Sequence, residues 1–117
     1  MARPLARRSR SKYRNLKVIL PDGTKFDSTH EYRVWQQLVA AEKAGVIRDL
    51  DRQVPFKICW PDGRLICTYY ADFTYTIVEN GLHVVSDAKG VKTSTYSLKK
   101  KLMKLALRID IHEVYAK

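Results

Sequence analysis

Asp87 and Lys89 lie two residues apart at the end of an apolar run, within the segment HVVSDAKGVKT that spans 83–93. An acid and a lysine at this spacing are expected about once by chance in a chain of this length. A carboxylate can bind a divalent cation, and a lysine ammonium can offset the charge of a phosphate. The pair therefore predicts a catalytic site only if further acids lie beside it.

Asp72 is the first candidate partner of this pair. A two-residue Asn-Gly turn at 80–81, the strongest short hairpin signal in the chain, sets a register in which Asp72 faces Lys89 and Thr74 faces Asp87. Side chains alternate between faces, so all four share one face, with the α-carbons of Asp72 and Asp87 about 7 Å apart. That spacing suits two carboxylates that share one Mg²⁺. The alternative is a cross-strand Asp72–Lys89 ion pair worth about 0.2–1 kcal/mol, which leaves Asp87 without an assigned basic partner.

Glu31 is a third acid with two compatible interpretations. Ser28 and Glu31 have the spacing of a capping box, which predicts a helix that runs to Ala44. Glu31 also falls at the i, i+4, i+7 spacing with apolar residues, so it points along the buried stripe, where a carboxylate needs a partner or a metal ion. The stripe consists of Val34, Trp35, Leu38 and Ala41.

The remaining segments alternate between strand and helix patterns. A second helix is predicted over 93–108, with one apolar stripe and a separate face of basic residues at i, i+4, i+8. The apolar stripe consists of Leu98, Leu102, Leu105 and Ile109, and the basic face of Lys100, Lys104 and Arg108. The strand patterns cover 52–60, 64–79, 82–89 and 110–116, after a short strand or arm at 16–26 with a Pro-Asp-Gly turn.

Basic residues are concentrated in two acid-free blocks. The chain has 117 residues and a formal net charge of +10; residues 1–17 hold seven Lys or Arg, and residues 92–108 hold six. The rest of the chain has nine Lys or Arg against twelve Asp or Glu, and is net −3. This segregation predicts a surface for nucleic acid. The alternative is a solubility tail and a solvated helix face.

The length allows one compact domain, which we place at 17–117 behind a flexible basic arm at 1–16. No apolar run approaches the roughly 20 residues needed to span a bilayer, so we expect no membrane partner and a cytoplasmic location. The candidate DNA-contacting residues are Arg7, Arg8, Arg10, Lys12 and Arg14 in the arm, and Lys92, Lys99, Lys100 and Lys104 near the second helix.

Four ordered motifs together resemble the PD-(D/E)XK, or restriction-endonuclease-like, nuclease superfamily, and in particular its small phage-encoded members. They are FDSTHEY at 26–32, RQVPF at 52–56, YYADF at 69–73 and DAKGVKT at 87–93. Two positions depart from the pattern: Ala71 stands in place of the proline, and Ser86 stands where many similar phage proteins have another acid. The resemblance covers about residues 23–115. It implies an α/β (α+β) fold with an αβββαβ core, in which helices flank a central mixed sheet.

The resemblance also implies roles for individual residues. Asp72 and Asp87 would bind Mg²⁺, for which Mn²⁺ could substitute, and Glu31 would help to bind it. Lys89 would position the attacking water. Gln53 and Thr93 are candidate supporting or backbone-contacting residues.

The implied activity is metal-dependent hydrolysis of phosphodiester bonds in DNA. No segment of the chain predicts base reading, and small members of this superfamily with basic arms include homodimeric Holliday junction resolvases. We therefore expect a structure-selective endonuclease that acts as a homodimer on branched DNA, in the host cytoplasm if the chain is phage-encoded. The alternatives are a nicking or end-processing nuclease for replication or packaging, and a non-catalytic DNA-binding protein with the same fold.

Overall fold

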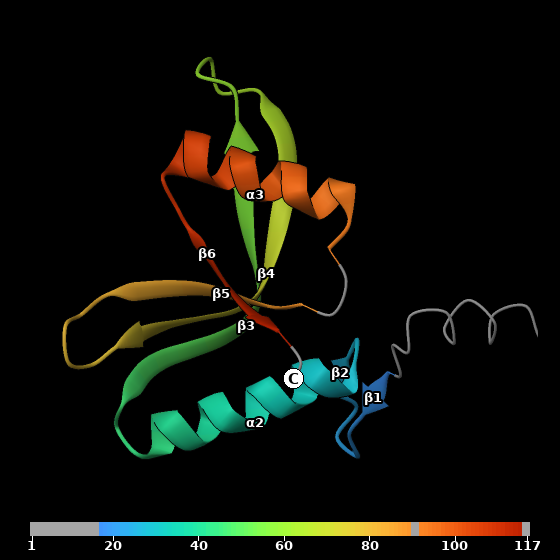
Figure 1. The fold of residues 1–117 in the computed structure, drawn as a ribbon, viewed down its shortest axis with the longest axis vertical. Coiled ribbons are helices and arrows are strands. Elements are labelled where there is room, and N and C mark those ends of the chain that lie inside the picture. The colour runs from blue at the N-terminus through green and yellow to red at the C-terminus, as the bar shows by residue number, and fades with distance from the viewer. Residues whose placement is uncertain (1–16, 90–91, 116–117) are drawn as a thin grey trace, which may run out of the picture.

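The computed structural model describes residues 17–89 and 92–115, so the predicted arm at 1–16 lies outside the described residues. The fold is mixed α+β; the described residues form two helices and a four-stranded sheet in the order β3-β4-β5-β6 (Figure 1). Strands β3, β4 and β5 are antiparallel and β6 is parallel to β5, which confirms a mixed sheet. The elements are β1 (Val18–Ile19), β2 (Lys25–Phe26), α2 (Thr29–Lys43), β3 (Ile47–Cys59), β4 (Leu65–Ile77), β5 (His83–Lys89), α3 (Ser94–Leu107) and β6 (Ile111–Tyr115).

The two helices lie at different ends of the sheet. In Figure 1, α3 crosses the upper part of the long β3–β4 hairpin, and α2 runs along the lower end. None of the helices in the described ranges is long and apolar enough to cross a bilayer.

Helix α2 begins and ends as its capping residues predict. The Ser28 side chain accepts a hydrogen bond from the Glu31 backbone N–H at 3.0 Å, and Ala44 is the C-cap. Gly45 follows with φ +80°, a left-handed conformation that glycine adopts without steric cost. The predicted stripe of this helix is buried or half-buried, and it carries Glu31 into the interior with an exposure of 3%.

The predicted register of the β4–β5 hairpin is wrong by two residues. Phe73 pairs with Ser86 and Thr74 pairs with Val85, rather than Thr74 with Asp87. The turn is wider than two residues: residues 78–82 separate β4 from β5, and within them the Asn80 side chain accepts a hydrogen bond from the Leu82 backbone N–H at 3.0 Å. A shift by two residues keeps every side chain on its predicted face.

The same shift changes the relation between the two aspartates. Continued beyond Phe73 and Ser86, the register sets Asp72 directly opposite Asp87 instead of diagonally from it. The expected convergence of these two acids therefore survives the error in the turn.

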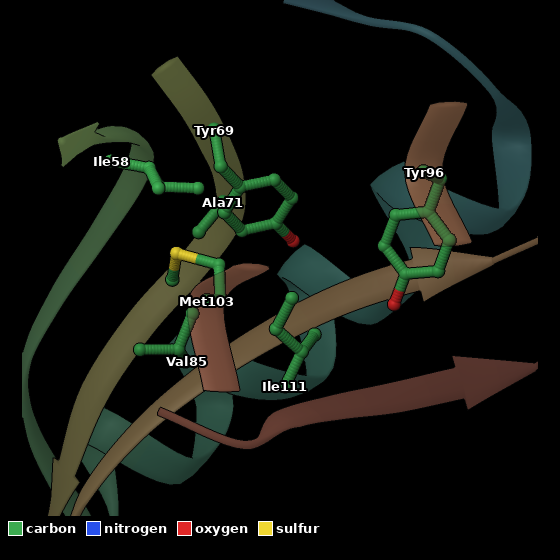
Figure 2. Packing of buried hydrophobic residues seen from close by; sticks show 7 residues of the cluster. All are labelled: Ile58, Tyr69, Ala71, Val85, Tyr96, Met103 and Ile111. Carbon is green, nitrogen blue, oxygen red and sulfur yellow. The ribbon is translucent and has the colours of Figure 1, made fainter. Parts of the chain in front are cut away.

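The predicted apolar stripe of α3 is only half right: Leu102 and Ile109 pack against the core cluster, but the other two members do not. Leu98 and Leu105 are 58% and 79% exposed, whereas Tyr96 and Met103 are buried against the sheet. These two residues are seven positions apart, so they occupy one face two turns apart. Figure 2 shows them in the main core cluster, which consists of Ile58, Tyr69, Ala71, Val85, Tyr96, Met103 and Ile111.

Candidate functional site

A hollow of about 270 Å³ opens where β4 and β5 diverge beneath the start of α3. The last paired positions of these strands are Phe73 and Ser86, so the segments beyond them are free to separate. We name this the acid hollow. Its lining residues are Tyr69, Tyr70, Asp72, Asp87, Lys89, Thr93, Thr95, Tyr96 and Lys99. Three of the four predicted catalytic residues thus line one cavity.

Asp87 is held by three neighbours and is 3% exposed. Its Oδ2 accepts a hydrogen bond from the Tyr69 hydroxyl at 2.7 Å and lies 2.9 Å from the Lys89 Nζ. Its Oδ1 accepts a longer bond, 3.4 Å, from the Asp72 backbone N–H. Lys89 therefore pairs with Asp87 on its own strand, and not with Asp72 across the hairpin.

In the described part of the chain, Asp72 has polar neighbours but no ion-pair partner. Its Oδ2 accepts a hydrogen bond from the Ala88 backbone N–H at 2.9 Å, and its Oδ1 accepts one from the Gln53 Nε2 at 3.4 Å. Within the described ranges, no lysine or arginine forms an ion pair with it. Burial is the largest cause of a raised pKa at Asp72, and together with the adjacent Asp87 and the nearby Glu31 it brings this pKa to about 8. The site thus places an uncompensated acid beside another acid.

Glu31 lies behind this pair, outside the lining of the acid hollow. Its Oε1 accepts a hydrogen bond from the Asp27 backbone N–H at 3.0 Å, one residue beyond the position that a capping box uses. Its Oε2 accepts from the Gln53 Nε2 at 3.3 Å and lies 3.7 Å from the Arg52 Nη2. Burial raises the pKa of Glu31, although the Asp27 backbone bond opposes this effect.

Gln53 connects the acids of the two elements. Its side-chain amide donates to both Glu31 and Asp72, so it joins α2 to β4. Its backbone φ is +52°, a left-handed conformation that is uncommon for a residue other than glycine, and strain of this kind gathers at functional sites. Thr93, the other predicted supporting residue, accepts a hydrogen bond from the Tyr96 backbone N–H as the N-cap of α3 and also lines the acid hollow.

The side chains near the acid hollow determine whether a metal ion could bind there. Among residues 17–89 and 92–115, no group of three or more His, Cys, Asp or Glu side chains is placed to hold one. Gln53 lies between Glu31 and Asp72 and donates to both, so the role of Glu31 as a third ligand stays a prediction. The Asp72–Asp87 pair remains, and it fits the usual binding of Mg²⁺, which uses one or two carboxylates together with water and substrate phosphates.

The predicted DNA-contacting lysines divide between two places. Lys99 lines the acid hollow and donates to the Thr68 backbone oxygen at 3.0 Å. The others line a second cavity of about 340 Å³ beside α3, which we name the lysine hollow. Its lining residues are Lys92, Ser97, Lys100, Lys101, Lys104, Ile109, Asp110 and Ile111. The four arginines and one lysine predicted in the arm, at 7–14, lie outside the described residues.

Acids already partner most of the lysines in the lysine hollow. Lys92 and Lys100 lie 3.5 Å and 3.0 Å from the Glu113 carboxylate. Lys104 lies 2.7 Å from the Asp110 carboxylate. A bound phosphate would therefore compete with these acids.

Two aromatic residues of the site were not predicted from the sequence. Tyr69 donates to Asp87, and the ring of Tyr96 lies 3.6 Å from the Lys89 Nζ in a cation–π contact. Period-two alternation sets Tyr69 and Asp72 on opposite faces, so strand patterning gives no sign that both reach Asp87. Tyr96 could have been predicted only by knowing which face of α3 packs against the sheet, and the spacing of the leucines indicates the wrong face.

Comparison with protein families gives one match. A family model described as a protein of unknown function, DUF1064, matches residues 10–115, and the chain belongs to this family. No curated protein and no solved structure matches the chain at a significant level.

Proposed function

We propose that this member of the DUF1064 family is a metal-dependent endonuclease with a restriction-endonuclease-like core, which hydrolyses phosphodiester bonds in branched DNA. The observation that carries the proposal is the pairing of Asp72 with Asp87 inside a cavity that also contains Lys89. Two adjacent carboxylates, one buried and one half-buried, are costly in a fold when one of them has no ion-pair partner among the described residues, unless a ligand compensates them. A divalent cation and a phosphate supply that compensation.

Asp72 and Asp87 would hold Mg²⁺ or Mn²⁺. Bound there, the ion would activate a water molecule and neutralise charge on the phosphate. Tyr69 and Lys89 fix the orientation of the Asp87 carboxylate, because both contact its Oδ2. Glu31 acts at one remove, through the Gln53 amide that it shares with Asp72.

Lys89 supplies the positive charge nearest to the acids. Its ammonium is held between the Asp87 carboxylate and the face of the Tyr96 ring. From this position it can offset charge on a phosphate that enters the acid hollow and orient an attacking water. Lys99, on the same wall, supplies a second contact to the backbone of the substrate.

The basic arm and the lysine hollow would extend the contact to phosphates away from the cut. Such contacts do not read bases, so affinity should fall steeply with salt and cleavage should depend on DNA shape. A resolvase that acts as a homodimer on a four-way junction in the cytoplasm is the form of this activity that we favour.

A side-by-side cleavage assay tests the proposal. Wild-type protein is incubated with a four-way junction, a linear duplex and a single strand, in Mg²⁺, in Mn²⁺ and in EDTA. We expect cutting only with a divalent ion and most rapidly on the junction, with Asp87→Asn as the inactive control. Equal cutting of junction and duplex would contradict the resolvase form, and binding without cutting in either metal would favour the non-catalytic DNA-binding alternative.

A further inference from the structure

Tyr70 is an exposed aromatic side chain on the wall of the acid hollow. It is 59% exposed, the largest fraction among the exposed aromatic residues of the described ranges. Within those ranges, no ring contact and no hydrogen bond of its hydroxyl holds the side chain. The β-propensity of tyrosine explains its presence on a strand, but leaves open why the ring lines this cavity.

The position of Tyr70 relative to the acids is set by the strand. Tyr70 and Asp72 are two residues apart on β4 and both line the acid hollow, so they are separated by about 7 Å along the strand. Across the hairpin Tyr70 pairs with Pro55, which is also exposed and leaves the ring uncovered. A phosphate beside Asp72 would therefore have an aromatic face about one nucleotide away.

We propose that Tyr70 is a stacking platform for an unpaired nucleobase next to the phosphate that is cut. The inference rests on the proposed function, since it takes the acid hollow as the place of that phosphate. A base inside an intact duplex is stacked on both faces and cannot reach an aromatic side chain, so the platform selects single-stranded or locally opened nucleic acid. Lys99, on the same wall, would contact the adjoining backbone.

The test measures binding without chemistry. Affinities are measured by fluorescence anisotropy in EDTA for three labelled probes of equal length, about 12 nucleotides each: an oligothymidylate, a fully abasic strand and a duplex. The variants are Tyr70→Ala and Tyr70→Phe. Trp60→Ala is the matched control, because Trp60 is comparably exposed at 54% and does not line the acid hollow.

We expect Tyr70→Ala to weaken oligothymidylate binding by about 5- to 150-fold, the range for loss of one base–aromatic stack. The abasic strand and the duplex should bind as they do to wild type, and Tyr70→Phe, which keeps the ring, should retain the preference for bases. Trp60→Ala should change none of the affinities. An unchanged affinity for oligothymidylate, or an equal loss on all three probes, would overturn the inference.

The binding readout separates this inference from the proposed nuclease activity. If the wild type cuts DNA but Tyr70→Ala still binds oligothymidylate more tightly than the abasic strand, the inference about Tyr70 is wrong and the proposed nuclease activity stands. If Tyr70→Ala abolishes that preference and no preparation cuts in Mg²⁺ or Mn²⁺, the platform stands and the nuclease chemistry fails.

Discussion

The Tyr96 side chain lies between two carboxylate clusters. Both contain acids, lysines and tyrosines, but the pKa of an acid is raised in one cluster and lowered in the other. On one side, its ring lies against Lys89 in the acid hollow, where Lys89 pairs with Asp87 and, among the described residues, Asp72 forms no ion pair. On the other side, its hydroxyl donates to Glu113 at 2.6 Å. We name the second group the Glu113 cluster; it consists of Glu113, Tyr96, Tyr115, Lys92 and Lys100.

The pKa values of the two clusters move in opposite directions. Burial and the acidic neighbours of Asp72 together raise its pKa to about 8. Burial also opposes ionisation of Glu113, but hydrogen bonds from Tyr115, Tyr96 and Lys100 outweigh it and lower the pKa of Glu113 to about 2. Glu113 has lysine and tyrosine partners within its cluster, whereas in the described part of the chain Asp72 has no ion-pair partner. That difference supports the proposal that the acid hollow is the place for a ligand.

Asp72→Asn should produce the largest effect. The substitution removes one of two proposed metal-binding carboxylates, so we expect cleavage of the preferred DNA to fall by at least about 100-fold, with DNA binding in EDTA intact or tighter. Glu113→Gln is the matched control in the Glu113 cluster and should retain cleavage. Cleavage by Asp72→Asn at the wild-type rate would remove the acid hollow as the active site.

The effect of Mg²⁺ on thermal stability should also differ between the acid hollow and the Glu113 cluster. Mg²⁺ at 10 to 100 times its dissociation constant should stabilise the wild type by about 1–3 kcal/mol, which is a rise of several degrees in Tm. Asp87→Asn should lose this rise and Glu113→Gln should keep it, in thermal unfolding at matched ionic strength. An equal rise in Tm for all three proteins would indicate non-specific binding of the ion.

In the absence of metal, substitutions in the two clusters should change stability in opposite directions. Glu113→Gln removes a charge that two lysines and two tyrosines compensate, so we expect a loss of about 1–2 kcal/mol, or at least about 4 °C in Tm. Asp72→Asn should leave Tm unchanged or raise it at pH 8, because it removes an ionised form that burial disfavours. Thermal unfolding in EDTA provides the measurement, and a lower Tm for Asp72→Asn would contradict the comparison.

Much of this arrangement follows from local sequence signals. The caps at Ser28 and Thr93 locate the helices, and two Pro-Asp-Gly turns locate the β1–β2 and β3–β4 hairpins. The approach of Asp72 to Asp87 was predicted from a turn of the wrong length. It holds because the error of two residues matches the period of a strand, whereas an error of one would have separated the acids.

The contacts that complete the site depend on tertiary structure, and the sequence carries little sign of them. Lys89 pairs with Asp87 on its own strand. Its contact with the Tyr96 ring depends on α3 packing with Tyr96 and Met103 inward. Leucine is the commoner core residue of a helix, so the spacing of Leu98 and Leu105 pointed to the wrong face. Gln53 could not be placed between Glu31 and Asp72 without its left-handed backbone, which no local residue preference predicts.

The smallest expected effect is a dependence of stability on pH that belongs to Glu113. Its pKa lies near 2 in the folded chain against an ordinary value of 4.5, so the unfolded chain binds the proton more readily. The stability that Glu113 contributes is therefore present above about pH 4.5 and is lost as the pH falls from there toward 2. Urea unfolding of wild type and Glu113→Gln should give a difference in the free energy of unfolding that is constant from pH 5 to 7 and shrinks below pH 4.5.

Asp110→Asn provides the matched control for this titration. Asp110 also pairs with a lysine of the lysine hollow, but its side chain is 78% exposed, so its pair should contribute little at any pH. A difference between wild type and Glu113→Gln that stays constant down to pH 3 would show that Glu113 is not the charged centre of its cluster. Glu113 would then no longer be an example of a carboxylate that its neighbours stabilise. The contrast between the two clusters would rest on the Asp72–Asp87 pair alone.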